Sequence, residues 1–286
     1  MRGATKIALK TIAKTLAAAA IGIAVFVSSG MYNIAATDQH TKPIYWLTEF
    51  AMQRSVQLRA REKETPDLTR EEMIGRGFVH YRNRCMQCHG GPGYAPDDAA
   101  LGMTPVPANL IPTTHQWTSA KIFWVVKHGI KMTGMPAWTY RMSDDEIWEV
   151  VAFVKQRLPY LSPREFQTMV TDTPPASRDD TGPLELTLAA TAGDAQAGRR
   201  AIDQYGCATC HVVPGVTGAT RQVGPPLTDI GSRSYIAGVL QNTRPNMVRW
   251  LMAPQHIRPI TAMPDLRVRE KDARDIAAYL ETLRSN

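Results

Sequence analysis

The sequence predicts an all-α fold, with an N-terminal transmembrane helix followed by two helical domains of the same plan. Three observations predict it. An uncharged run of 22 residues lies near the N-terminus, apolar residues recur at helical spacing in the body, and each half holds one Cys-x-x-Cys-His motif. Few stretches alternate polar and apolar residues with period two, so little β-structure is expected.

Length and charge set further bounds. At ~150 residues per domain, 286 residues suggest about two domains. The 20 Gly and 20 Pro are too few for a low-complexity or collagen-like chain. The net charge is +7, but four of the basic residues precede Asp38, the first acidic residue. The body holds no clustered basic run, so nucleic acid is not an expected partner.

The N-terminal region, 1–36, predicts a membrane anchor. Thr15 to Ala36 carry no charge, and a helix of that length would span about 33 Å, enough to cross a hydrocarbon core. Basic residues before it and Asp38 after it place the N-terminus in the cytoplasm and the body outside. A cleaved signal peptide ending near Val27-Ser28-Ser29 is the alternative. We expect a retained single-pass anchor in the bilayer of a bacterial inner membrane, with both domains in the periplasm.

The segment 37–69 predicts a stalk or amphipathic helix. A helix is expected from Pro43 to Glu64, because proline suits the first helical turn. Tyr45 and Trp46 lie where an interfacial aromatic belt would be. The sequence leaves open whether this helix lies at the membrane interface or packs on the first domain.

The body divides into two segments of the same plan, at 70–160 and 194–286. Each has a helix before its Cys-x-x-Cys-His motif, a later Met-Pro pair and a closing helix. The expected helices are Arg70–Arg84, Asp144–Arg157, Asp194–Tyr205 and Lys271–Leu283. The offset is 122 residues from Cys85 to Cys207 and 128 from Met135 to Met263, which indicates a duplicated module. Residues 161–193, rich in Pro, Ser, Thr and Asp, are expected to be a linker.

All four cysteines lie in two motifs, Cys85-Met86-Gln87-Cys88-His89 and Cys207-Ala208-Thr209-Cys210-His211. This pattern is the attachment signature of c-type haem. Two thiols at i and i+3 share one face of a helical turn and can reach the two vinyl groups of one porphyrin, while the adjacent histidine binds the iron as proximal ligand. The sequence therefore predicts two covalently attached c-type haems, with His89 and His211 on the irons.

Three other interpretations fit the cysteines less well. A zinc ribbon would need about 15 to 20 residues between the pairs, whereas 118 residues separate Cys88 from Cys207. Thioredoxin-like redox motifs would need a βαβ context. A disulfide framework is typical of short secreted chains.

Both segments resemble class I cytochrome c domains, over about Arg70 to Arg157 and Asp194 to Arg284. The resemblance implies that Met135 and Met263 are the second iron ligands. A thioether favours the ferrous state and raises the potential, which suits electron transfer. The rival ligands left open are Met132 in the first domain, Met247 and Met252 in the second, and His80, His115, His128 and His256 if either haem has two histidines.

The resemblance also implies that a proline carbonyl accepts the Nδ1 proton of each proximal histidine. Pro225, in Gly224-Pro225-Pro226-Leu227, is the expected acceptor in the second domain. Pro107 is the nearest candidate in the first domain, although no glycine precedes it. First and last helices are expected to meet where Gly77 and Tyr81 face Phe153, and in the second domain where Gly198 faces Tyr279.

Residues Asn242 to Leu266 are similar to cytochrome c domains associated with haem-copper oxidases. The first domain with its anchor resembles tandem dihaem membrane cytochromes. We therefore expect an electron-transfer subunit of a respiratory chain, with the subunits of a membrane-bound complex as partners and a terminal oxidase as destination, and no enzyme activity of its own. The alternatives are the cytochrome subunit of a periplasmic dehydrogenase and a dihaem peroxidase, which would need an open iron position.

Overall fold

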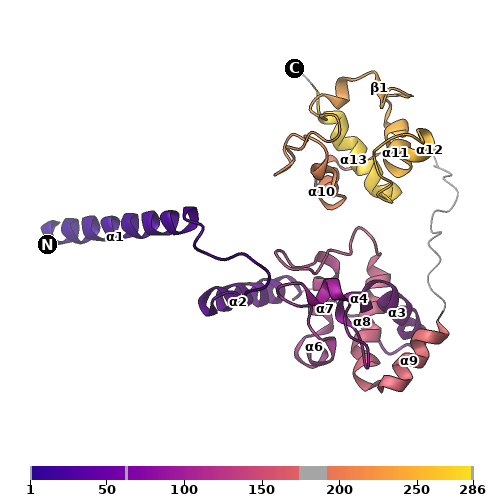
Figure 1. Cartoon of the computed structure of the whole chain (residues 1–286), viewed down its shortest axis with the longest axis horizontal. Helices are drawn as coiled ribbons and strands as arrows, with labels where there is room; N and C mark the ends of the chain where they lie inside the picture. Colours follow the sequence, from indigo (N-terminus) through magenta and orange to yellow (C-terminus); the bar gives the residue numbers. More distant parts are fainter. Residues whose placement is uncertain (1, 62–63, 174–191, 285–286) are drawn as a thin grey trace.

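The computed structural model describes residues 2–61, 64–173 and 192–284, and their regular secondary structure is helical apart from one short pair of strands (Figure 1). The N-terminal part holds α1 (Arg2–Ser28) and α2 (Lys42–Arg59). The first domain holds α3 (Glu71–Arg84), α4 (Met86–His89), α5 (Asp98–Leu101), α6 (Leu110–Gln116), α7 (Ser119–His128), α8 (Asp144–Gln156), the 3-10 turn η1 (Leu158–Tyr160) and α9 (Pro163–Asp172). The second holds α10 (Ala195–Gln204), η2 (Cys207–Thr209), η3 (Ile230–Ser232), the antiparallel strands β1 (Tyr235–Ile236) and β2 (Leu240–Gln241), α11 (Arg244–Met252), α12 (Pro254–Ile257) and α13 (Glu270–Thr282).

Helix α1 begins earlier and ends earlier than the sequence predicts. It ends at Ser28, where Gly30 has a φ of +69°, a left-handed conformation that commonly stops a helix. The expected span from Thr15 to Ala36 is therefore wrong in its bounds, because residues 29–36 are not helical. The part of α1 that is long and apolar enough to cross a membrane is Thr5–Ser28, and none of it is buried in the protein. An anchor and a signal sequence both fit this helix.

Helix α2 packs on the first domain with one half and exposes the other. Its N-terminal half is exposed, and Trp46 stacks on Phe50 with ring centroids 5.5 Å apart. Its C-terminal half lies against α7 of the first domain, where Val56 and Ala60 are buried. The helix ends at Arg59, short of the expected Glu64. Residues 62–63 of that expectation lie outside the described residues.

The core of the first domain is the crossing of α3 and α8. A Cβ on Gly77 would lie 1.9 Å from the carbonyl oxygen of Glu149 and 3.0 Å from the Cβ of Phe153, so the two backbones touch at this glycine. The ring of Phe153 is fully buried and lies 5.2 Å from that of Tyr81. The expected contact of Gly77 and Tyr81 with Phe153 is confirmed.

The second domain repeats this crossing with α10 and α13. A Cβ on Gly198 would lie 1.9 Å from the carbonyl oxygen of Asp275, four residues before the expected Tyr279, just as Glu149 stands four residues before Phe153. The Tyr279 hydroxyl donates to the carbonyl of Pro214. The glycine of each first helix thus meets a backbone carbonyl of the last helix, and α11 covers α13 from another side.

Helix α9 corrects the expected linker at 161–193. Ser162 and Glu165 form a capping box, and Pro163 occupies the first turn of the helix. Phe166 is fully buried, with its ring 6.0 Å from Phe78 and 5.6 Å from Tyr94. The composition predicted a linker here because Ser and Pro are common in linkers, but they are also common at the first residues of helices. The first domain therefore includes α9, and residues 174–191 of the expected linker lie outside the described residues.

The cap of α9 yields a first testable prediction. Ser162→Ala removes the hydroxyl that accepts from the backbone N–H of Glu165, and we expect it to lower the free energy of unfolding by about 1 kcal/mol. Thr168→Ala is the control, because its exposed hydroxyl bonds only within its own helix and the change should stay within about 0.5 kcal/mol. Urea unfolding followed by circular dichroism measures both. Equal effects of the two substitutions would contradict the role of the cap.

Candidate haem-binding sites

In the first domain, the helical turn after α3 carries both thiols and the imidazole of the motif. The backbone N–H groups of Cys88 and His89 both donate to the carbonyl of Cys85, at 3.0 and 2.9 Å, which closes α4 around the motif. Burial raises the pKa of the Cys85 thiol to about 12. The three reactive side chains therefore follow one another on a single turn.

The second motif forms the same kind of turn. Gly206, with φ +71°, reverses the chain after α10, and the N–H of His211 donates to the carbonyl of Cys207 at 3.0 Å. Burial raises the pKa of the Cys207 thiol to about 11. All four cysteines are free thiols, and among the described residues no three or more His, Cys, Asp or Glu side chains form a group that could hold a metal ion.

A backbone carbonyl holds each imidazole through its Nδ1 atom. In the second domain His211 Nδ1 lies 2.7 Å from the carbonyl oxygen of Pro225, the expected acceptor. In the first domain His89 Nδ1 lies 2.8 Å from the carbonyl of Ala108. The expected acceptor there, Pro107, is therefore wrong by one residue. Asn109 caps α6 by accepting from the N–H of Ile111, and the residue just before this cap is the one whose carbonyl faces His89.

These contacts fix the protonation state and the orientation of both rings. A carbonyl can only accept, so Nδ1 carries the proton and Nε2 keeps the lone pair that a metal ion needs. Burial lowers the pKa of His89, which favours the neutral ring. In the second domain Gly224 packs on the imidazole, since a Cβ there would lie 2.4 Å from His211 Cε1. The residue at 224 must therefore be small.

The two predicted methionine ligands lie in loops of the same local geometry. The backbone N–H of Met135 donates to the Thr133 hydroxyl at 3.1 Å, and that of Met263 donates to the Thr261 hydroxyl at 3.2 Å. Both methionine side chains are half-buried against the core of their domain. The repeated Thr-x-Met-Pro pattern was visible in the sequence, but the role of the threonines was not predicted.

The rival methionines are placed less suitably. Met132 has a φ of +60° and is 94% exposed, so its side chain lies in solvent. Met247 is buried in the core on α11, and Met252 packs against the same core. Of the five methionine candidates, Met135 and Met263 are the two that share one loop geometry.

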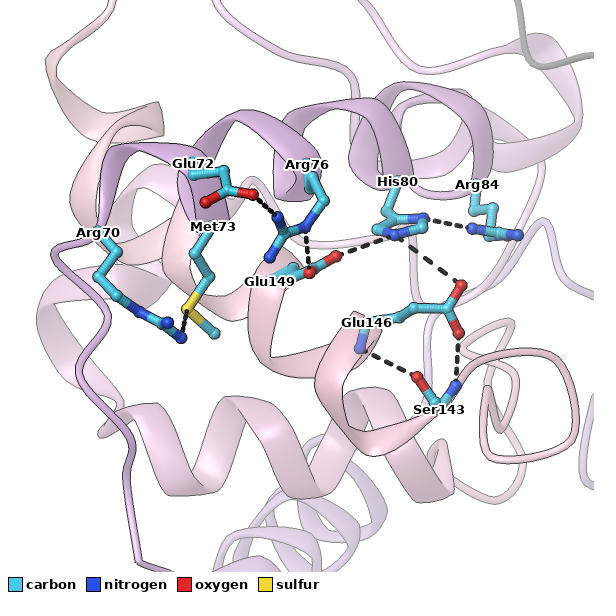
Figure 2. A network of polar contacts seen from close by, with 9 residues as sticks. All are labelled: Arg70, Glu72, Met73, Arg76, His80, Arg84, Ser143, Glu146 and Glu149. Atoms are coloured by element: carbon cyan, nitrogen blue, oxygen red, sulfur yellow. Dashed lines mark hydrogen bonds and ion pairs between the residues drawn. The ribbon is translucent and has the colours of Figure 1, made fainter.

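Figure 2 shows why His80 is unsuited to bind iron. Its Nε2 atom lies 3.2 Å from a carboxylate oxygen of Glu149, and its Nδ1 accepts from the Arg84 guanidinium at 2.6 Å. Both ring nitrogens are therefore engaged. Arg76 also pairs with the buried Glu149 at 2.5 Å, so this network ties α3 to α8. Of the other histidines, His128 packs on Trp124 at 4.9 Å, while His115 and His256 are exposed.

A cavity of about 110 Å³ adjoins His89 in the first domain. It is lined mostly by apolar and aromatic side chains together with the loop that accepts from the imidazole. Its lining includes Tyr81, Tyr94, Pro107, Leu110 and Leu158. The cavity is too small to hold a porphyrin and its lining does not include Met135, so it marks only the space beside the imidazole. A neutral, oriented imidazole on the same turn as two free thiols fits a covalently held porphyrin. Fold and motif together define a duplicated helical haem-binding domain.

Comparisons with known proteins identify the family. Residues 72–154 match the model of the family described as "Cytochrome C oxidase, cbb3-type, subunit III", and residues 195–284 match the family described as "Cytochrome c". The chain is therefore a tandem class I cytochrome c, and its two domains bind haem c.

Two curated relatives are described as "Cytochrome c oxidase subunit 2". The protein from Alkalihalophilus pseudofirmus strain OF4 is 34% identical over 93 residues, which cover 32% of this chain and 26% of the relative. The protein from Bacillus sp. strain PS3 is 36% identical over 61 residues, which cover 21% of this chain and 17% of the relative. The chain thus spans about a quarter or less of the length of each relative. No solved structure matches the chain significantly.

Proposed function

We propose that this chain is a membrane-anchored dihaem cytochrome that passes electrons along a respiratory chain toward a terminal oxidase. The observation that best supports this proposal is that both domains hold the same set of chemical groups. Each has two free thiols and an imidazole on one turn, and its imidazole Nδ1 is held by a backbone carbonyl. Bound haem would supply reversible one-electron exchange between ferric and ferrous iron.

The residues of the chain would prepare each site for that exchange. The carbonyls of Ala108 and Pro225 hold the imidazoles so that Nε2 is free to ligate. The thioethers of Met135 and Met263 would ligate the irons together with the histidines and raise the potentials. A full set of protein ligands in both domains supports electron transfer over the peroxidase alternative, which needs an iron position open to peroxide.

The direction of transfer rests on the relatives. The first domain matches a family described as an oxidase subunit, and two curated relatives are described as oxidase subunits. We infer that the partner is a respiratory oxidase complex. A dehydrogenase partner stays an alternative that purification of the native complex from detergent-solubilised membranes would distinguish.

The membrane attachment is part of this proposal. The apolar part of α1, Thr5–Ser28, is unburied, and Lys6, Lys10 and Lys14 on its first half suit the cytoplasmic face, where long basic side chains extend to the headgroups. The exposed aromatic residues of α2, Tyr45, Trp46 and Phe50, suit the opposite interface. Since α2 also packs on α7, it would hold the first domain close to the periplasmic surface.

The haem count tests the proposal directly. We expect two haems per polypeptide in the native protein by pyridine haemochrome assay, and one in the double variant Cys207→Ala/Cys210→Ala, because each motif holds its haem independently. The double variant Cys85→Ala/Cys88→Ala should likewise retain one. Fewer than two haems in the native protein, or loss of both from either variant, would contradict independent covalent attachment.

A further inference from the structure

A contact joins the methionine loop of the first domain to the second domain. The guanidinium carbon of Arg141 lies 4.1 Å from the centroid of the Tyr205 ring. Tyr140 packs edge-on against the same ring, with centroids 6.1 Å apart, and its carbonyl oxygen lies 3.2 Å from the Tyr205 hydroxyl. Tyr140 thereby joins the hydrophobic cluster of the second domain.

In the second domain, hydrogen bonds and burial hold the Tyr205 ring in place. Its hydroxyl lies 2.8 Å from a carboxylate oxygen of Asp272 and accepts from the backbone N–H of Arg269 at 3.3 Å. The residue is only 3% exposed. Tyr205 follows α10 and stands two residues before Cys207. A rigid aromatic face therefore lies directly beside the second haem-attachment turn.

On the first domain, the contacting residues belong to the segment that carries the predicted iron ligand. Tyr140 and Arg141 follow Met135 by five and six residues. The segment is held at its end, because Met142 is 2% exposed and Ser143 caps α8. Arg141 also donates to the carbonyl of Tyr140 at 3.0 Å, which holds its guanidinium toward Tyr205.

The chemistry of the two sides is complementary. A guanidinium over the face of a tyrosine ring is a favourable cation–π pair. Charged side chains of both signs from α10 and α13, namely Arg200, Asp203, Lys271 and Asp272, lie around Tyr140, so the docking contact rests on the cation–π pair and the tyrosine packing. The contact is small, so it suits a reversible docking surface rather than a fused core.

We propose that the contact of Tyr140 and Arg141 with Tyr205 docks the second domain on the methionine loop of the first domain. This docking would set the rate of electron exchange between the two haem-binding domains. The inference rests on the proposed function, which it deepens by naming the partner surface inside the chain. Docking joins the Met135 loop to the Cys207 turn. Exchange between the halves then occurs at a preset contact rather than by random encounter of two tethered domains.

Arg141→Glu tests the docking surface in the full-length haem-loaded protein. The variant replaces the cation with an anion over the negative face of the Tyr205 ring. The control is Arg164→Glu, which makes the same charge change on exposed α9. Two readouts are compared: the radius of gyration by small-angle X-ray scattering, and the rate of electron exchange between the haems after photoreduction.

We expect Arg141→Glu to expand the protein in solution and to slow inter-haem exchange by about tenfold or more, because docking no longer keeps the local concentration high. Arg164→Glu should change neither quantity. Unchanged scattering and rate in Arg141→Glu would overturn the docking inference, as would a second domain docked on another copy of the chain, visible as a dimer by ultracentrifugation.

The haem count separates this outcome from failure of the proposed function. If the native protein carries two reducible haems and Arg141→Glu leaves the exchange unchanged, the docking inference alone fails. If the native protein carries fewer than two haems, the proposed function fails whatever the scattering shows. A second variant, Tyr140→Ala, controls for the case in which Arg141→Glu disturbs folding. It should also expand the protein in solution and slow the exchange between the haems.

Discussion

Histidine in place of Met135 is expected to lower the midpoint potential of one haem, whereas histidine in place of Met132 should leave both potentials unchanged. A neutral thioether favours ferrous iron, and an imidazole in its place donates more strongly and favours ferric iron. The expected fall is roughly a few tenths of a volt, within the ~0.8 V range over which axial ligands set haem potentials.

The two methionines form a matched pair. They stand three residues apart in one loop, but Met135 is half-buried against the core whereas Met132 is 94% exposed. The two substitutions are chemically identical, so any general effect on the loop should be common to both. Only the residue that ligates the iron should change the potential.

A spectroscopic redox titration of the purified protein measures this prediction. Native protein and Met132→His should give the same two midpoints, and Met135→His should move one of them downward while the other stays. The visible absorption of a methionine–iron bond near the red edge of the spectrum should be halved only in Met135→His. If Met132→His moves a midpoint and Met135→His does not, the ligand assignment in the first domain is wrong.

The second large effect is expected at the crossing of α3 and α8. Gly77→Ala would place a Cβ 1.9 Å from the Glu149 carbonyl oxygen, a distance that backbone atoms cannot tolerate, so the two helices must move apart. Because Phe153 and Tyr81 pack beside this contact, separation loosens the aromatic core as well. We expect a loss of about 1–3 kcal/mol or more in the free energy of unfolding.

Gly75 supplies the control on the same helix. It is exposed, and no atom lies within 4 Å of a Cβ built there. Gly75→Ala should therefore stabilise the protein by about 0.5–1 kcal/mol, because alanine loses less backbone entropy in a helix. Urea unfolding of the two variants should move the midpoint in opposite directions. A shift of the same sign in both would show that the helix crossing is not as close as described.

The sequence anticipated the helices that carry regular apolar patterns. The helices on both sides of each haem motif lie within one residue of their expected bounds, because their apolar faces recur with helical period and their caps are local. The sequence-based prediction was wrong where the same residue types are common in two kinds of structure. Ser162 and Pro163 are consistent with a linker, but they start α9, whose docking depends on Phe166 meeting Phe78.

The sequence also missed contacts that depend on distant residues. No local pattern indicated that the carbonyl of Asp275 lies closest to Gly198, because this depends on how α10 and α13 cross. The expected Pro107 carbonyl was wrong by one residue, since the carbonyl of Ala108 holds His89. A shift of one residue along an extended segment turns a different carbonyl toward the imidazole, and the cap at Asn109 sets that shift.

What the sequence determined by itself is the local chemistry of the two motifs. Residues at i, i+3 and i+4 share one helical turn whatever surrounds them, so two thiols and an imidazole are brought together by spacing alone. Only the tertiary structure decided which carbonyl holds each imidazole. It also decided that Arg141 meets Tyr205, since that contact joins residues 64 positions apart whose approach depends on how two domains fold and dock.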